Sequence, residues 1–137
     1  MKKLFFDNDV ILDISIDRGM DIKDSVKLMN LVEEKVYEGY TSSVIFTNTY
    51  YIQRKLIGHE MSIGFLKNLR LLLTVLSVGD SAIRNALESE FKDFEDAIQY
   101  FTALENGMDC IITRNASDYK KSSIPVYSPT ELLEMTN

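Results

Sequence analysis

Apolar and polar residues alternate along this chain with two periods, one typical of strands and the other of helices. Short apolar or β-branched runs predict strands at residues 3–6, 40–42, 74–78, 110–113 and 126–127. Between these runs, apolar residues recur every three or four positions, which is the spacing of an amphipathic helix. The expected helices cover residues 10–14, 24–38, 45–57, 60–73, 82–87 and 93–106, and a last one begins near residue 129.

Residues with strong preferences for helix ends support these boundaries. Asp21 or Asp24 is suited to begin the long second helix, and Gly39 and Gly107 are each placed to end a helix. The segment Ser128-Pro129-Thr130-Glu131 combines a capping box with a proline at the first helical position.

Strands that alternate with helices favour a mostly parallel sheet that is covered on both faces. No internal repeat, low-complexity tract or Pro/Gly-rich linker interrupts the pattern. We therefore expect an α/β fold, a three-layer α/β/α sandwich with a mostly parallel central sheet, in a single domain over residues 1–137.

The composition limits the cellular compartments and binding partners that we expect for this protein. The one cysteine, Cys110, allows no intramolecular disulfide, and no apolar stretch is long enough for a signal peptide or a membrane span. We expect a cytoplasmic protein without a membrane partner. The net charge of −6 argues against broad electrostatic binding of nucleic acid, although a bound divalent cation would reverse the sign locally.

Acidic side chains stand where α/β proteins usually bind ligands. Asp7 and Asp9 come directly after the first strand, Asp93 and Asp96 open a helix, and Asp118 follows a later strand. Because the carboxyl ends of parallel strands meet at one edge of a sheet, we expect these carboxylates to converge there. Mg²⁺ and Mn²⁺ prefer oxygen ligands, so the pattern indicates a cation held by acids.

Several of these acids also have structural explanations. Asp9 could be the N-cap of the first helix and Asp93 that of a later one, whereas Asp118 could be a turn residue. Asp7 is hard to explain as a cap for a helix that begins a few residues later, which favours a functional role. Asp13 is expected to be a solvated helix residue.

Other catalytic schemes fit the sequence poorly. His59 is the one histidine, and its place beside Gly58 is typical of a surface connection. No nucleophile elbow, zinc-binding Cys/His spacing, P-loop or glycine-rich dinucleotide motif is present. Metal-dependent phosphodiester hydrolysis is the chemistry that the acids favour.

The order of these motifs resembles that of the PIN domain family, in particular the small VapC-type toxins, over essentially the whole chain. Residues 7–13 resemble the opening D-T-N or D-T-D motif with its later aspartate. Residues 92–100 resemble the helix that carries the third acid of the family, which we match to Asp96. Residues 113–119 resemble its T-R-[DN]-x-x-D-[FY] segment.

The resemblance implies an endoribonuclease that requires Mg²⁺ or Mn²⁺, cleaves RNA with a metal-activated water and is the toxin of a toxin–antitoxin pair. It implies a cognate antitoxin and a homodimer as partners. The expected catalytic residues are Asp7, Asp96 and Asp118. The expected metal ligands are Asp7, Asp9, Asp93 and Asp96. The expected substrate contacts are Asn48, Thr113, Arg114 and Asn115.

One position departs from the family pattern. Asn48 lies where many PIN nucleases carry a glutamate, and an amide brings no charge to a metal site. A catalytically weak PIN-like binding or regulatory module is therefore a second hypothesis. A third is a haloacid dehalogenase-like phosphatase, since residues 7–10 also fit its D-x-D-x-[TV] signature, but the chain after Thr113 leaves little room for its further motifs.

Overall fold

Five parallel strands form the centre of the protein. The computed structural model describes residues 2–17 and 22–136. The strands are β1 (Lys2–Phe6), β2 (Tyr37–Ser42), β3 (Leu73–Leu76), β4 (Cys110–Ile112) and β5 (Val126–Tyr127). They pair in the order β3-β2-β1-β4-β5, and each of these pairs is parallel. The carboxyl ends of the strands therefore lie at the same edge of the sheet.

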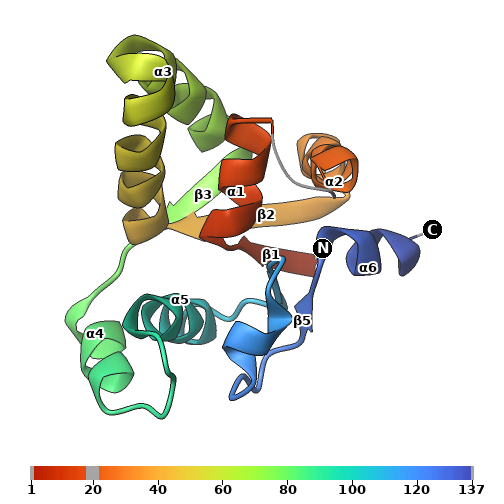
Figure 1. Cartoon of the computed structure of the whole chain (residues 1–137). Coiled ribbons are helices and arrows are strands. Elements are labelled where there is room, and N and C mark those ends of the chain that lie inside the picture. The colour runs from red at the N-terminus through yellow and green to blue at the C-terminus, as the bar shows by residue number, and fades with distance from the viewer. Residues whose placement is uncertain (1, 18–21, 137) are drawn as a thin grey trace.

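Helices cover both faces of the sheet and complete three layers. They are α1 (Asn8–Ser15), α2 (Ile22–Glu33), α3 (Ser43–Leu72), α4 (Asp80–Leu87), α5 (Phe94–Glu105), α6 (Pro129–Glu134) and a short 3-10 helix, η1 (Ala116–Tyr119). In Figure 1, α1, α2 and α3 lie on one side of the sheet, and α4 and α5 lie on the other. The predicted α/β/α sandwich with a parallel sheet is confirmed.

The central strand β1 is buried because helices cover both of its faces. Leu4, Phe5 and Phe6 are fully buried. The backbone amide of Asp7 then donates a hydrogen bond (2.9 Å) to the carbonyl of Ile112 in β4. The first acidic side chain after the apolar run is thus placed at the carboxyl edge of the sheet.

The first helix begins earlier than predicted, and the second begins between the two residues proposed as its cap. α1 begins at Asn8, earlier than residue 10, and its N-cap is Asp7. Asp21 lies outside the described residues. Asp24 lies in the first turn of α2, where its carboxylate accepts a hydrogen bond (2.6 Å) from the Thr130 hydroxyl of α6.

Gly39 does not end a helix, as the sequence suggested, but lies within β2. A Cβ atom at this position would lie 2.4 Å from Leu73 Cδ2 and 2.9 Å from Val32 Cγ1. Side chains from β3 and α2 therefore leave room only for glycine. α2 ends earlier than predicted, at Glu33.

The two helices predicted on either side of Gly58 are two halves of α3. Gly58 adopts a φ of 82°, which interrupts the helical backbone at this point. Among the described residues, no helix has the length and the apolar character needed to cross a membrane.

Candidate active site

Carboxylates from distant parts of the chain line one open pocket at the carboxyl edge of the sheet. The pocket has a volume of about 320 Å³. Its polar lining consists of Asp7, Asn8, Asp9, Asp93, Glu95, Asp96, Asn115 and Asp118. The structure therefore brings together the aspartates that the sequence placed at strand and helix ends. We call this set of residues the acidic pocket.

Asp7 is the most buried acid of the pocket, with 6% of its surface exposed. Its Oδ1 accepts a hydrogen bond (2.7 Å) from the Asn8 amide, so Asp7 does cap α1, contrary to the expectation. Its Oδ2 accepts a hydrogen bond (3.1 Å) from the Thr113 hydroxyl, directly after β4. The start of α1 and the residue after β4 thus each orient one oxygen of the Asp7 carboxylate.

Asp9 holds the loop that follows β4 in place through hydrogen bonds. It is not the N-cap of α1, because it lies inside the first turn of that helix. Its carboxylate accepts hydrogen bonds from the Thr113 hydroxyl (3.1 Å), the Arg114 backbone amide (3.2 Å) and the Asn115 side-chain amide (3.0 Å). Thr113 and Asn115, expected to contact substrate, are thus held by the acids.

The Arg114 side chain contacts α1. Its Nε lies 2.9 Å from Oδ2 of Asp13, whose side chain is only 5% exposed. The expectation that Asp13 is solvated was therefore wrong. The role of Arg114 toward substrate stays a prediction.

Two hydrogen bonds place the first turn of α5 against the pocket. Asp93 is the N-cap of this helix, and its Oδ1 accepts a hydrogen bond (2.9 Å) from the backbone amide of Asp96. One turn later, the buried Gln99 accepts a hydrogen bond (2.6 Å) from the Ser42 hydroxyl at the end of β2. Asp96 lies between these two anchors and lines the acidic pocket.

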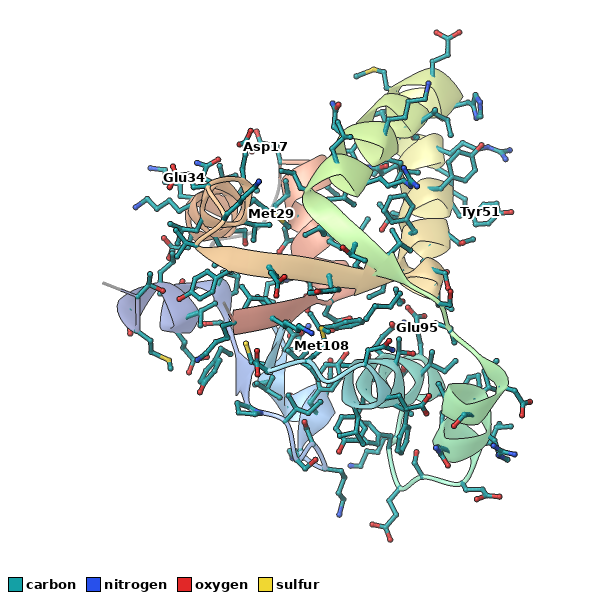
Figure 2. The ribbon with its side chains drawn as sticks, turned by 180° about the vertical axis from the view of Figure 1, so that it is seen from behind. Asp17, Met29, Glu34, Tyr51, Glu95 and Met108 are labelled. Atoms are coloured by element: carbon teal, nitrogen blue, oxygen red, sulfur yellow. The ribbon has the colours of Figure 1, made fainter. Side chains whose placement is uncertain are left out.

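Asn48 does not line the acidic pocket itself but contacts Glu95, which does. Its Nδ2 donates a hydrogen bond (2.7 Å) to Glu95 Oε1, which joins α3 to α5. Figure 2 shows Glu95 between the start of α3 and α5. Glu95 was not among the residues predicted for the site. A signal was present, since Glu95 shares the first helical turn with Asp96, and side chains of a first turn surround the same helix end.

Burial and repulsion from neighbouring carboxylates raise the pKa values of Asp7 and Asp96. Burial raises the pKa of Asp7 to about 6, and the nearby Asp9 charge adds to this effect. Burial raises the pKa of Asp96 to about 7, with further contributions first from Asp7 and then from Asp93, Asp118 and Glu95. Asp7 and Asp96 therefore repel each other across one shared space.

The buried Tyr119 hydroxyl is a second group that the sequence analysis did not assign. It lies near enough to Asp7 to lower the pKa of that carboxyl, as the Thr113 hydroxyl and the Asn8 amide do. Burial and the negative charge of Asp7 raise the pKa of Tyr119 in turn. Among the described residues, this buried hydroxyl makes no hydrogen bond of normal geometry.

The oxygen donors of the pocket fit a hard divalent cation. Within the described part of the chain, no three Asp, Glu, His or Cys side chains are arranged to hold a metal ion by themselves. Mg²⁺ does not require such a set, because one or two carboxylates, several waters and substrate phosphates usually suffice. Repelling carboxylates with raised pKa values are the charge pattern that a cation would relieve.

A second cavity adjoins the acidic pocket and carries lysines. It has a volume of about 280 Å³ and shares Asp93, Asp96 and Asp118 with the acidic pocket. Its other lining residues include Phe91, Lys92, Ser117, Lys120 and Lys121. We call it the lysine cavity. Positive charge thus lies directly beside the acids.

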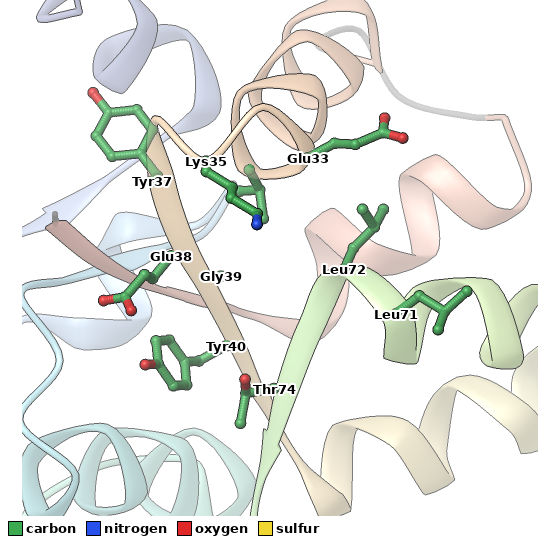
Figure 3. Close-up of a pocket in the computed structure, with 10 residues that line it drawn as sticks. Glu33, Lys35, Tyr37, Glu38, Gly39, Tyr40, Leu71, Leu72 and Thr74 are labelled. Atoms are coloured by element: carbon green, nitrogen blue, oxygen red, sulfur yellow. The ribbon is translucent and has the colours of Figure 1, made fainter.

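A larger cavity lies at the opposite end of the strands. It has a volume of about 470 Å³ and is formed by the first half of β2, the start of β3 and the end of α2 (Figure 3). Glu33, Lys35 and Glu38 are its charged residues. Because their charges are mixed and the aspartates lie elsewhere, the acidic pocket is the better candidate for chemistry.

Comparison with known proteins identifies relatives along nearly the whole chain. Ribonuclease VapC1 of Aquifex aeolicus is 29% identical over 141 residues, which cover 99% of this chain and 96% of that protein. The crystal structure of DNA-bound VapBC from Salmonella typhimurium matches with a TM-score of 0.70 and 14% identity, over 94% of this chain and 99% of that one. Mycobacterium tuberculosis VapC20, described as a Sarcin-Ricin loop cleaving toxin, matches with a TM-score of 0.62 and 16% identity, over 79% and 86% of the two chains.

The solved structures share the fold at low sequence identity. The family model described as PIN domain matches residues 3–117, a segment that runs from the second residue of β1 past β4 and contains most acids of the pocket. This chain therefore belongs to the PIN domain family.

Proposed function

We propose that this protein is a metal-dependent endoribonuclease that hydrolyses RNA phosphodiester bonds, and that it is the toxin of a toxin–antitoxin pair. The observation that carries the proposal is the convergence of Asp7 and Asp96, from opposite parts of the chain, in one open pocket of oxygen donors. Membership of the PIN domain family and the 29% identity to Ribonuclease VapC1 support the same activity.

In this proposal Asp7 and Asp96 hold Mg²⁺ or Mn²⁺, with Asp9 and Asp93 close by. Such a cation, when bound, polarises the phosphate and activates the attacking water. Asp118, at the exposed rim of the pocket, orients that water. The Thr113 hydroxyl keeps the Asp7 carboxylate in place through its 3.1 Å hydrogen bond.

The RNA backbone would cross the acidic pocket and continue over the lysine cavity. Lys92 and Lys120 lie beside the shared acids and could contact phosphates next to the scissile one. Asn115 and Asn48 contribute by holding Asp9 and Glu95, through hydrogen bonds of 3.0 Å and 2.7 Å. The substrate is thus recognised by its phosphates on the side of the acids where the lysine cavity lies.

We also propose a cognate antitoxin and a homodimer as partners, and a single domain over residues 1–137. The Klebsiella pneumoniae toxin–antitoxin complex supports the first idea through its shared fold, at a TM-score of 0.68 and 18% identity. The single sheet, which contains both β1 and β5, supports the last. Co-purification with the product of an adjacent reading frame would test the antitoxin. Sedimentation would test the homodimer, and a single cooperative unfolding transition would test the single domain.

Cleavage assays with paired variants test the enzymatic proposal. Asp7→Asn and Asp96→Asn should each abolish Mn²⁺-dependent cleavage of RNA while circular dichroism shows a folded protein. Asp80→Asn, an exposed aspartate of α4, is the matched control and should cleave like the wild type. Full activity of a folded Asp7→Asn protein would refute the assignment.

Calorimetry distinguishes the nuclease proposal from the binding-module hypothesis. A nuclease should bind Mn²⁺ at the acidic pocket, whereas no binding at millimolar metal would favour a module without this chemistry. Membership of the PIN domain family gives the haloacid dehalogenase alternative no support.

A further inference from the structure

Glu95 is a long, exposed side chain whose position is nevertheless constrained. It lines the acidic pocket with Asp7 and Asp96, and its Oε1 accepts the 2.7 Å hydrogen bond from Asn48 Nδ2. An exposed glutamate normally keeps several rotamers, and ordering it costs conformational entropy. Repulsion from neighbouring carboxylates would also turn it toward solvent. The Asn48 amide opposes both tendencies.

The residue type at position 48 suits this task. A side-chain amide can donate a hydrogen bond to a carboxylate, whereas a glutamate at the same place would repel Glu95. The bond crosses from α3 to α5, two helices on opposite sides of the sheet that meet at its carboxyl edge. The neutral residue is thus paired with a charge from the facing helix.

We infer that Glu95 is a cation-binding carboxylate of the acidic pocket and that Asn48 is its positioning residue. The inference rests on the proposed metal-dependent function. Asn48 therefore does not leave the site short of a negative charge. The carboxylate that α3 lacks at position 48 is provided by Glu95 of α5. Glu95 would act on the metal directly, and Asn48 would act only through Glu95.

Mn²⁺ titration calorimetry at neutral pH tests this inference without relying on cleavage. Glu95→Gln should weaken Mn²⁺ binding by at least about tenfold, and Asn48→Ala should weaken it by a smaller factor. The double variant should bind no more weakly than Glu95→Gln alone, since Asn48 has nothing left to position. Glu60→Gln, an equal charge change at an exposed glutamate of α3 beyond Gly58, is the control and should leave the affinity unchanged.

A swap of the two side chains provides an independent test. The variant Asn48→Glu/Glu95→Gln restores a carboxylate and an amide at this rim in exchanged positions, and it should recover most of the affinity lost in Glu95→Gln. Thermal unfolding in EDTA should show all variants folded, as both side chains reach the surface.

The outcomes separate this inference from the proposed function. If the wild type cleaves RNA and binds Mn²⁺ while Glu95→Gln binds it equally well, the inference fails and the nuclease proposal stands. If Asn48→Ala weakens binding further in the Glu95→Gln background, the positioning role of Asn48 is wrong. If the wild type binds no Mn²⁺, both ideas fail together.

Discussion

Arg114 Nε lies 2.9 Å from Asp13 Oδ2, and this ion pair ties the loop after β4 to helix α1. The same loop is held a second time, because the Arg114 backbone amide donates a hydrogen bond to Asp9. Asn115 and Asp118, which follow in the chain, therefore occupy positions that α1 helps to determine. A charge pair outside the acidic pocket supports the geometry within it.

Arg114→Ala should lower the free energy of unfolding by about 1–3 kcal/mol, because it removes a charged hydrogen bond to a buried carboxylate. Arg84→Ala, which breaks an exposed pair with Asp80 at 3.7 Å, is the control and should change stability by less than about 1 kcal/mol. Urea unfolding of both variants measures the difference. Equal effects would show that the Asp13 pair has no special structural role.

Gly39→Ala should destabilise the protein by about 1–3 kcal/mol, because its Cβ would overlap side chains of Leu73 and Val32. Gly64→Ala is the matched control, since the added Cβ in α3 would meet nothing within 4 Å beyond its chain neighbours and the backbone of its own helix. It should stabilise the protein by about 0.5–1 kcal/mol, because alanine replaces glycine inside a helix. Thermal unfolding compares the two, and a stable Gly39→Ala protein would contradict the packing described.

The apo protein should lose stability as Asp7 ionises. Its pKa is raised from 3.8 to about 6, so the folded state binds this proton more tightly than the unfolded chain does. The resulting stabilisation is complete below the unfolded value and is lost as the pH rises through about 6. Asn caps helices as well as Asp. Asp7→Asn should therefore be more stable than the wild type at pH 8, by roughly 3 kcal/mol, and this advantage should vanish near pH 4.

Denaturant unfolding in EDTA at several pH values measures this difference. Asp80→Asn serves as the control, because it removes an exposed carboxylate that does not line the pocket. A stability difference between Asp7→Asn and the wild type that does not change with pH would contradict the raised pKa of Asp7.

Mn²⁺ affinity should fall as the pH decreases from 8 to 5, because the cation competes with protons on Asp7 and Asp96. Their raised pKa values of about 6 and about 7 place this competition near neutral pH. Each displaced proton contributes up to about a tenfold change in affinity per pH unit. Calorimetry in buffers of different ionisation enthalpy counts the released protons, and Asp96→Asn should release fewer. An affinity independent of pH would place the metal elsewhere.

Lys92→Ala and Lys120→Ala should weaken RNA binding by the inactive Asp7→Asn protein and reduce its dependence on salt. Each lost phosphate contact lowers the slope of log affinity against log salt by about 0.7 for single strands. Lys27→Ala, on α2 across the sheet, is the control. Fluorescence anisotropy at several salt concentrations gives the slopes. Unchanged slopes would mean that the RNA does not follow the lysine cavity.

Local sequence patterns were sufficient to predict the strands and helices that carry the site. The buried run before Asp7 predicted β1, and Asp93, Gly107 and the capping box at Ser128 predicted helix ends that the structure confirms. These features depend on neighbours within a few residues, so they can be read from the order of the chain. The convergence of the acids followed from the parallel order of the strands.

Other features depended on which segments meet in space. The glycine at position 39 faces Leu73 and Val32, Arg114 pairs with Asp13, and Asn48 holds Glu95. Each partner lies far away in the sequence or points in a direction set by helix packing, so local propensity carries no information about it. The amino-acid sequence by itself thus determined the sheet and the acids at its carboxyl edge. Only the tertiary structure decided which side chains orient those acids, because hydrogen bonds and close contacts depend on distances of a few ångströms between separate helices and strands.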